Sequence, residues 1–179
     1  MTLALPIHTE RLVLRRLLPS DLERFAAYRA DPVLARYQGW NPMNHDEARA
    51  FITAMPAQPT LDVGTWHQIA IASPAGDDLL GDIGLCCREN GDAEVGFTLM
   101  HEAQGKGFAT EALQGLAREL FKRPEVVRIV GVTDERNRAS VRVLERLGMK
   151  LASKHEAIFK QEPCVELHYE LARETGSNG

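Results

Sequence analysis

The chain is poor in the residues that build metal centres and disulfide frameworks. Its three cysteines are Cys86, Cys87 and Cys164, and no Cys-x-x-Cys spacing or neighbouring His pair accompanies them. A metal site is therefore not expected. An odd cysteine count, with no recognisable secretory leader, predicts a reducing, cytoplasmic location.

Long apolar runs and excess positive charge are also missing. No stretch is apolar and long enough to cross a membrane. The formal net charge of -4 argues against a protein that binds nucleic acid by neutralising phosphates. It does not exclude an anionic cofactor, because such a ligand needs only local positive potential. We therefore expect neither a nucleic-acid partner nor a membrane partner.

A chain of 179 residues has the length of one domain. We expect residues 1–173 to form that domain and the small, polar tail 174–179 to be disordered. The central stretch, residues 93–113, indicates a strand, a loop with two glycines and then a helix. The helix is indicated by apolar residues at helical spacing, namely Leu113, Leu116, Ala117, Leu120 and Phe121.

The loop between this strand and helix has a chemical use. The first turn of a helix leaves N–H groups without partners and carries partial positive charge. Gly105 and Gly107 let the backbone approach a ligand closely, so the loop can cradle a phosphate or pyrophosphate. The sequence does not fit a Walker loop, which needs Lys-Ser or Lys-Thr after its final glycine, or a dinucleotide fingerprint. A tight connection without a ligand remains the alternative.

The spacing of Gln104, Gly107 and Ala109 after a strand resembles the acyl-CoA pyrophosphate loop of the GNAT acetyltransferase superfamily. The longer string 95–112 and the opening 9–15 resemble its RimJ/RimL-like branch. A second resemblance to the superfamily covers the segment 137–149, where Asn137 and Gly148 fit the two ends of a helix.

The resemblance implies an α/β (α+β) fold. Its sheet would be mixed, mostly antiparallel and twisted, with about six or seven strands and about four helices on its faces. The strands Glu94–Met100 and Val127–Thr133 would splay apart in the middle. Capping boxes at Ser20 and Asn44 predict two helix starts in the N-terminal part.

The resemblance also implies a cofactor, acetyl-CoA, used as a co-substrate without a metal. Its pantetheine arm would lie in the splay and pair with the central strand, while its pyrophosphate would lie on the loop. The residues implied to bind it are Phe97, Thr98, Leu99, Gln104, Gly105, Lys106, Gly107, Phe108, Ala109, Thr110, Asn137 and Ser140. Asn137 as a simple helix cap and Ser140 as a small packing residue are the alternatives.

Two residues are candidates for proton transfer. Glu94 on the central strand is the first choice for general base, although a carboxylate that faces solvent or an arginine is an equal alternative. His67 and His101 rank lower. Many members of the superfamily place a tyrosine acid where this chain has Leu144, so Ser140 is the candidate acid and water the alternative.

Tyr37, Trp40 and Asn41 lie where the family has a wall of its acceptor groove, and they are candidate acceptor-binding residues. The aromatic pair fits the edge of a core equally well.

We expect an N-acetyltransferase that moves the acetyl group of acetyl-CoA to a primary amine by direct attack in a ternary complex. The acceptor is a protein N-terminus or a small molecule, and the enzyme is a monomer or homodimer. The alternatives are a non-catalytic acyl-CoA-binding or sensing module and a nucleotide-phosphate binder. Sequence alone does not choose the acceptor, because function depends on the site rather than the fold.

Overall fold

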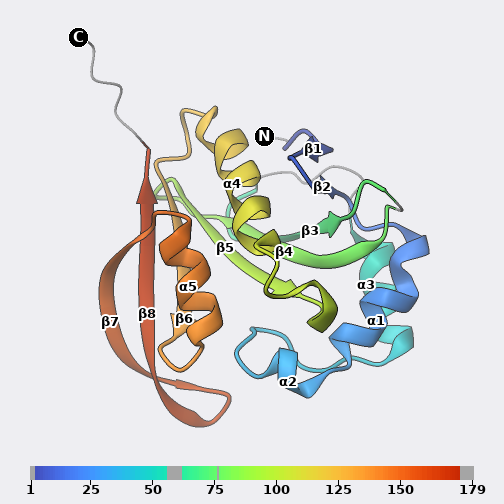
Figure 1. Cartoon of the computed structure of the whole chain (residues 1–179). Coiled ribbons are helices and arrows are strands. Elements are labelled where there is room, and N and C mark those ends of the chain that lie inside the picture. The colour runs from blue at the N-terminus through green and yellow to red at the C-terminus, as the bar shows by residue number, and fades with distance from the viewer. Residues whose placement is uncertain (1–2, 56–61, 76, 174–179) are drawn as a thin grey trace.

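The computed structural model describes residues 3–55, 62–75 and 77–173. Within them, eight strands form one sheet in the order β1-β2-β3-β4-β5-β6-β8-β7 (Figure 1). The strands are β1 (Ile7–His8), β2 (Val13–Arg15), β3 (Trp66–Ala72), β4 (Leu79–Cys87), β5 (Asp92–Leu99), β6 (Arg128–Asp134), β7 (Lys150–Phe159) and β8 (Glu162–Ala172). The predicted tail 174–179 lies outside the described residues.

Five α-helices accompany the sheet in the described part of the chain. They are α1 (Leu22–Arg29), α2 (Pro32–Ala35), α3 (His45–Ala54), α4 (Phe108–Phe121) and α5 (Arg138–Arg146), and two 3₁₀ turns (Pro19–Asp21 and His101–Ala103) precede α1 and the glycine loop. The predicted mixed fold is confirmed, with a higher count of elements. The difference comes from short elements such as β1 and α2, which carry too few residues for a periodic signal.

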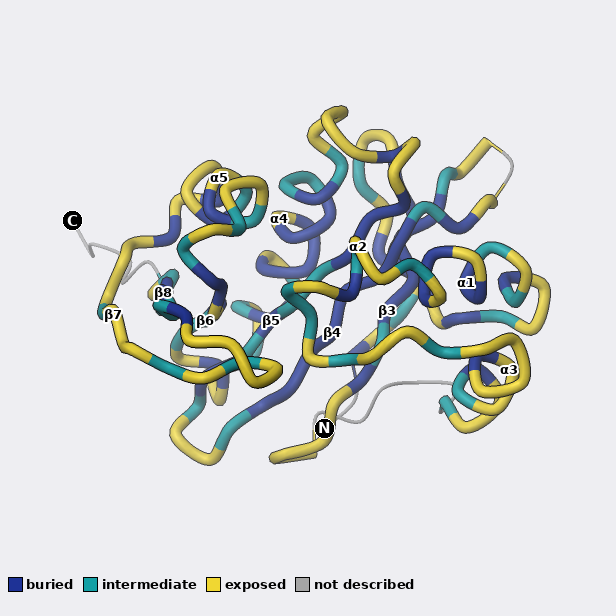
Figure 2. The backbone as a smooth tube through the Cα atoms, turned by 90° about the horizontal axis from the view of Figure 1, so that it is seen from below, coloured by how far each residue is buried: buried dark blue, intermediate teal, exposed yellow. Residues whose placement is uncertain are grey.

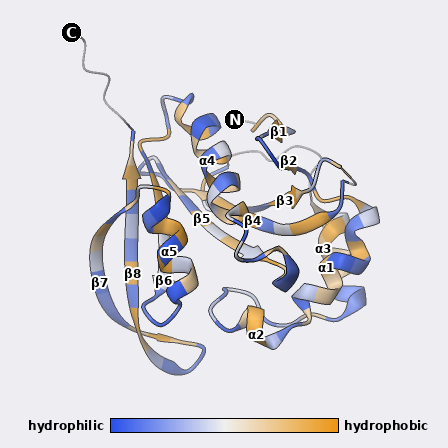
Figure 3. Ribbon diagram, in the orientation of Figure 1, coloured by the Kyte–Doolittle hydropathy of each residue, from blue (hydrophilic) through white to orange (hydrophobic). Residues whose placement is uncertain are grey.

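Helices cover both faces of the sheet. The main core lies between the sheet and α4, whose buried residues recur at helical spacing and include Ala112, Leu113, Leu116 and Leu120. A smaller core joins α1 and α3 to β3 and β4 through Phe25, Ile52 and Ala70, among others. Figure 2 shows that the buried backbone runs through β3, β4 and α4, whereas β7 is mostly exposed. Figure 3 shows that α5 has a polar face and an apolar face.

The sheet opens between β5 and β6, as predicted. These parallel strands pair only at Asp92–Glu94 with Arg128–Val130, and the ladder then stops. On its other side β5 stays paired with β4 as far as Leu99, and β6 stays paired with β8 along its whole length. The two halves of the sheet therefore separate beyond Glu94, which leaves one edge of β5 without a strand partner.

A buried ion pair holds the smaller core beside this opening. Arg29 of α1 contacts Asp82 of β4, and both side chains are 2% exposed. Aromatic rings surround the guanidinium: its central carbon lies 4.9 Å from the Phe25 ring centroid and 4.4 Å from that of Trp40. Burial raises the pKa of Asp82, and the neighbouring Arg29 charge opposes that rise.

The described residues contain no helix that is both long and apolar enough for a membrane crossing. In the same residues, no group of three or more His, Cys, Asp or Glu side chains is placed to hold a metal ion.

Removing one partner of the buried pair should destabilise the fold strongly. We expect Asp82→Ala to lower the free energy of unfolding by about 3–5 kcal/mol, because it leaves the Arg29 charge buried and uncompensated. Urea denaturation measures this loss. Glu119→Gln, which breaks the exposed pair with Lys122, should cost less than about 1 kcal/mol. Equal losses in the two variants would show that the buried pair contributes no more to the free energy of unfolding than the exposed pair.

Candidate active site

Two hollows of similar size meet at the free edge of β5. The first, which we call the loop hollow, has a volume of about 440 Å³ and lies between the end of β5, the glycine loop and α5. Its wall contains every residue predicted to bind a cofactor except Lys106. These are Phe97, Thr98, Leu99, Gln104, Gly105, Gly107, Phe108, Ala109, Thr110, Asn137 and Ser140. Lys106 is exposed and lies outside the wall.

The glycine loop ends at the N-terminus of α4. Gly107, the residue before the helix, has a φ of 79°, in the left-handed region that glycine adopts without strain. No described side chain caps this helix start. The first-turn N–H groups, from Phe108 to Thr110, are therefore open to an anionic group in the hollow.

Arg11, which the sequence analysis did not single out, holds this loop in place. Its guanidinium donates to the Lys106 carbonyl over 3.0 Å and to the Glu111 carboxylate over 2.7 Å. It also lies over the Phe108 ring, 4.8 Å from the centroid. Thr9 donates to the same Glu111 carboxylate. These bonds and the bond from the Arg11 N–H lower the pKa of Glu111 despite its partial burial.

The free edge of β5 presents backbone groups to the loop hollow. In an antiparallel ladder, every second residue of a strand bonds to the neighbouring strand, and the residues between direct their backbone groups to the other side. Arg88 bonds to Asp92 and Leu80 to Met100 at the two ends of the β4–β5 ladder, so the even-numbered residues of β5 bond to β4. Thr98 therefore directs its backbone groups toward Asp82 of β4. Phe97 and Leu99 direct theirs into the opening.

Two side-chain amides confirm that direction. Gln38 donates to the Phe97 carbonyl over 3.2 Å, and Gln104 donates to the Leu99 carbonyl over 3.0 Å. Among the described residues, no acceptor meets the N–H groups of Phe97 and Leu99. The β4 ladder uses the backbone groups of Thr98, so this residue lines the loop hollow without offering them to a ligand.

Asn137 and Ser140 lie together at the start of α5. The Asn137 side chain accepts from the Ser140 N–H over 3.2 Å, so it is a helix cap, and both residues line the loop hollow. Capping uses the Asn137 carbonyl oxygen and leaves its amide nitrogen for another partner.

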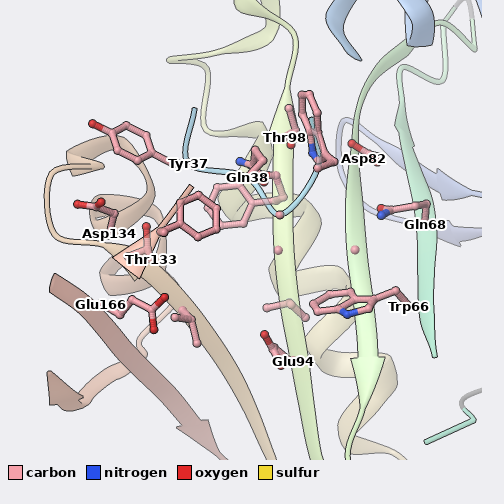
Figure 4. A pocket seen from close by; sticks show the side chains of 18 of the residues that line it. Tyr37, Gln38, Trp66, Gln68, Asp82, Glu94, Thr98, Thr133, Asp134 and Glu166 are labelled. Atoms are coloured by element: carbon pink, nitrogen blue, oxygen red, sulfur yellow. The ribbon is translucent and has the colours of Figure 1, made fainter. Parts of the chain in front are cut away.

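The second hollow, which we call the sheet hollow, has a volume of about 420 Å³ and lies over the splayed strands (Figure 4). Side chains reach it from β3, β4 and β5 on one side and from β6 and β8 on the other, including Trp66, Glu94 and Glu166. Tyr37 and Trp40 belong to its wall. The two hollows share four residues, Tyr37, Gln38, Phe97 and Thr98.

Asn41 does not line the sheet hollow, and its role as an acceptor residue stays a prediction. It lies in a separate surface depression with Arg136 and Lys160. The chain turns away at Trp40, whose carbonyl accepts from Lys160 over 2.7 Å.

The hollows differ in charge. The basic residues described in the wall of the loop hollow are His101, Arg142 and Arg146, and no carboxylate is described there. Within the described part of the chain, the wall of the sheet hollow has four carboxylates, Asp82, Glu94, Asp134 and Glu166, and one cation, Arg29. The first hollow therefore favours an anion, whereas in the second carboxylates outnumber cations.

Most of these carboxylates have arginine partners. Glu94 contacts Arg88, which also donates over 3.0 Å through its Nε atom. Asp134 accepts from Arg136 over 2.6 Å, and this bond lowers the Asp134 pKa. Glu166 has only His168, at 3.7 Å, among the described residues.

The two histidine candidates do not share one site. His101 is exposed at the loop hollow and pairs with Asp31 over 2.8 Å. His67 is buried on β3 and outside both hollows, where burial lowers its pKa. The structure also brings Gln38, Arg142 and Arg146 to the hollows. No local sequence pattern marks these three, because exposed polar side chains have no fixed period.

Comparisons with known proteins agree with this geometry. Residues 11–150 match the family model of the acetyltransferase (GNAT) domain. An uncharacterised N-acetyltransferase, p20 of Bacillus licheniformis, is 29% identical over 146 residues, which cover 80% of this chain and 82% of the relative.

Solved structures share the fold. A GNAT-family acetyltransferase from Bacillus anthracis superposes with a TM-score of 0.82 at 23% identity, covering 94% of this chain and 98% of that one. RimL, a ribosomal L7/L12 α-N-protein acetyltransferase solved with coenzyme A, superposes with a TM-score of 0.77 at 17% identity. The match covers 96% of this chain and 98% of that one.

Loss of the Arg11 contacts should loosen the glycine loop. We expect Arg11→Met to speed amide hydrogen exchange about tenfold at Glu111, whose N–H bonds to the Gly107 carbonyl at the end of the loop, because roughly 1.4 kcal/mol of hydrogen bonding to the loop is lost. Arg16→Met removes an exposed arginine nearby and should leave this exchange unchanged. If Glu111 exchange in Arg11→Met matches that of the unmodified chain, Arg11 does not hold the loop.

Proposed function

The chain belongs to the GNAT acetyltransferase family and is an acyltransferase, and from this premise we propose that it transfers the acetyl group of acetyl-CoA to a primary amine. The observation that carries the proposal is the meeting of two oppositely charged hollows at Phe97 and Thr98. An anionic cofactor and a cationic acceptor can reach this point from opposite sides. We further infer that residues 1–173 work as one catalytic domain.

The residues of the loop hollow suit coenzyme A. The uncapped start of α4 offers N–H groups to a pyrophosphate, and Arg142 and Arg146 add positive charge at the wall. The free N–H groups of Phe97 and Leu99 suit an arm that pairs with β5 as an added strand. When bound, acetyl-CoA supplies an activated acetyl thioester.

The sheet hollow suits the amine. Its carboxylates attract an ammonium group, while Trp40, Trp66 and Tyr37 offer aromatic surface to the rest of the acceptor. Attack requires the neutral amine, so a group in this hollow must accept a proton.

We assign that proton to Glu94, the carboxylate on β5 in the wall of the sheet hollow. Its contact with Arg88 fixes the carboxylate's orientation. A preorganised N–H at the β5 edge, from Phe97 or Leu99, would stabilise negative charge that develops on the acyl oxygen. Ser140, in the wall of the loop hollow, is the side chain we assign to protonate the leaving thiolate.

The acceptor is either a protein N-terminus or a small amine. The first is supported by the resemblance of 95–112 to the RimJ/RimL-like branch and the second by the limited volume of the sheet hollow, about 420 Å³. A screen of acetyl-CoA against peptides with free N-termini, amino acids, polyamines and aminoglycosides, read by release of free thiol, tests the proposal. Turnover with at least one amine is expected. Tight binding of coenzyme A with no turnover on any class would contradict it.

A negative side chain in the glycine loop should abolish cofactor binding. We expect Gly107→Glu to weaken acetyl-CoA affinity at least 100-fold in calorimetry, because it places bulk and charge at the start of α4. Gly64→Glu is the matched control, since Gly64 also has a left-handed φ of 80° and open space around it, outside both hollows. Unchanged affinity in Gly107→Glu would contradict the loop assignment.

Loss of the Glu94 carboxylate should slow the reaction without weakening the cofactor. We expect Glu94→Gln to lower kcat about 100-fold or more, within the usual contribution of general base catalysis, with the KM for acetyl-CoA within twofold. Steady-state kinetics near neutral pH measure both. Glu89→Gln, an exposed neighbour, should behave like the unmodified enzyme. A kcat that Glu94→Gln leaves intact would move the base elsewhere.

A further inference from the structure

Lys160 makes a long-range contact that the reaction scheme does not use. It lies in the turn between β7 and β8, and its Nζ donates to two backbone carbonyls, of Ala35 over 2.8 Å and of Trp40 over 2.7 Å. Partial burial lowers the Lys160 pKa. Lys160 also lies outside the segment 11–150 that matches the family model.

The two carbonyls flank a short segment, Tyr37–Trp40, which we call the acceptor wall. All four of its residues line the sheet hollow, and Tyr37 and Gln38 also line the loop hollow. The Gln38 amide reaches across to the Phe97 carbonyl on the free edge of β5. The position of this wall therefore sets the shape of the passage between the hollows.

Few apolar contacts hold the acceptor wall. None of its four residues is buried, and Ala35 just before it is 2% exposed. Its fixed points are polar: Lys160 at both ends, the Gln38 side-chain bond in the middle, the Gln38 N–H bond to the Ala35 carbonyl and the contact between the Trp40 ring and Arg29. Without Lys160, the Trp40 carbonyl loses its described protein partner, and the wall keeps only weak restraints.

We propose that Lys160 is a positioning residue that fixes the acceptor wall and thereby determines how well the sheet hollow receives the amine. The inference rests on the proposed function for the identity of the ligand in that hollow. The contact of Lys160 with the wall, which we call the latch, does not depend on the proposed function.

The test joins kinetics to a spectroscopic readout of the wall. The chain has two tryptophans, Trp40 and Trp66, so a Trp66→Phe background leaves Trp40 as the single reporter. In that background Lys160→Met should shift Trp40 emission to the red and increase its quenching by acrylamide at least twofold. In the natural background Lys160→Met should raise the KM for the amine about tenfold, with the KM for acetyl-CoA within twofold. Lys160→Arg should restore both readouts.

A second variant separates positioning from folding. Lys160 has a φ of 47°, which asparagine tolerates better than lysine, so Lys160→Asn removes the latch and relieves backbone strain. Its melting temperature should be unchanged or higher while its acceptor KM rises as in Lys160→Met. Lys154→Met removes an exposed lysine on β7 and should change neither readout.

Each outcome decides the inference. Unchanged Trp40 emission and quenching in both variants would overturn the latch, and an equal rise in both KM values, or none, would overturn its effect on the acceptor. If the unmodified chain acetylates no amine, the proposed function fails by itself, and the Trp40 readout alone then supports or overturns the latch.

Discussion

The separation of β5 from β6 is the constraint on which the rest of the structure depends. Three paired positions hold these strands together before the ladder ends at Glu94 and Val130. An unpaired strand edge inside a protein is costly unless a partner covers it, because its N–H and C=O groups lose their hydrogen bonds. Here Gln38 and Gln104 satisfy the carbonyls, and the N–H groups of Phe97 and Leu99 remain for a ligand.

The two hollows at this opening differ in charge. The loop hollow combines the positive end of the α4 dipole with the two arginines of α5, whereas the sheet hollow is lined by carboxylates, most of which are held by arginines. An overall negative chain can therefore bind an anionic cofactor, since the local field at the site differs in sign from the net charge. In the proposed reaction, the same segregation would place cofactor and acceptor in different hollows.

Local signals in the sequence predicted the elements that position the site. The capping box of Asn44 and Glu47, the cap at Asn137 and the left-handed Gly148 are all present. The capping box predicted at Ser20 is wrong. Asp21 instead accepts from Arg15 and from the Leu18 N–H, so its carboxylate holds the 3₁₀ turn that precedes α1.

The contacts that local signals missed join residues far apart in the chain. Arg11 reaches Lys106, Gln38 reaches Phe97, and Lys160 reaches Ala35 and Trp40. Each is a single polar side chain whose partner is a backbone carbonyl, and a carbonyl is present at every position. No periodicity or spacing in the sequence can therefore identify the pair, although the fold brings the two together.

Amide hydrogen exchange with and without coenzyme A tests the central claim most directly. The free edge of β5 and the start of α4 should together hold the cofactor. Saturating coenzyme A should therefore slow exchange at Phe97, Leu99 and the first-turn amides 108–110, and leave Thr98, already bonded to β4, much less affected. Protection confined to other parts of the sheet, with these amides unchanged, would contradict the account.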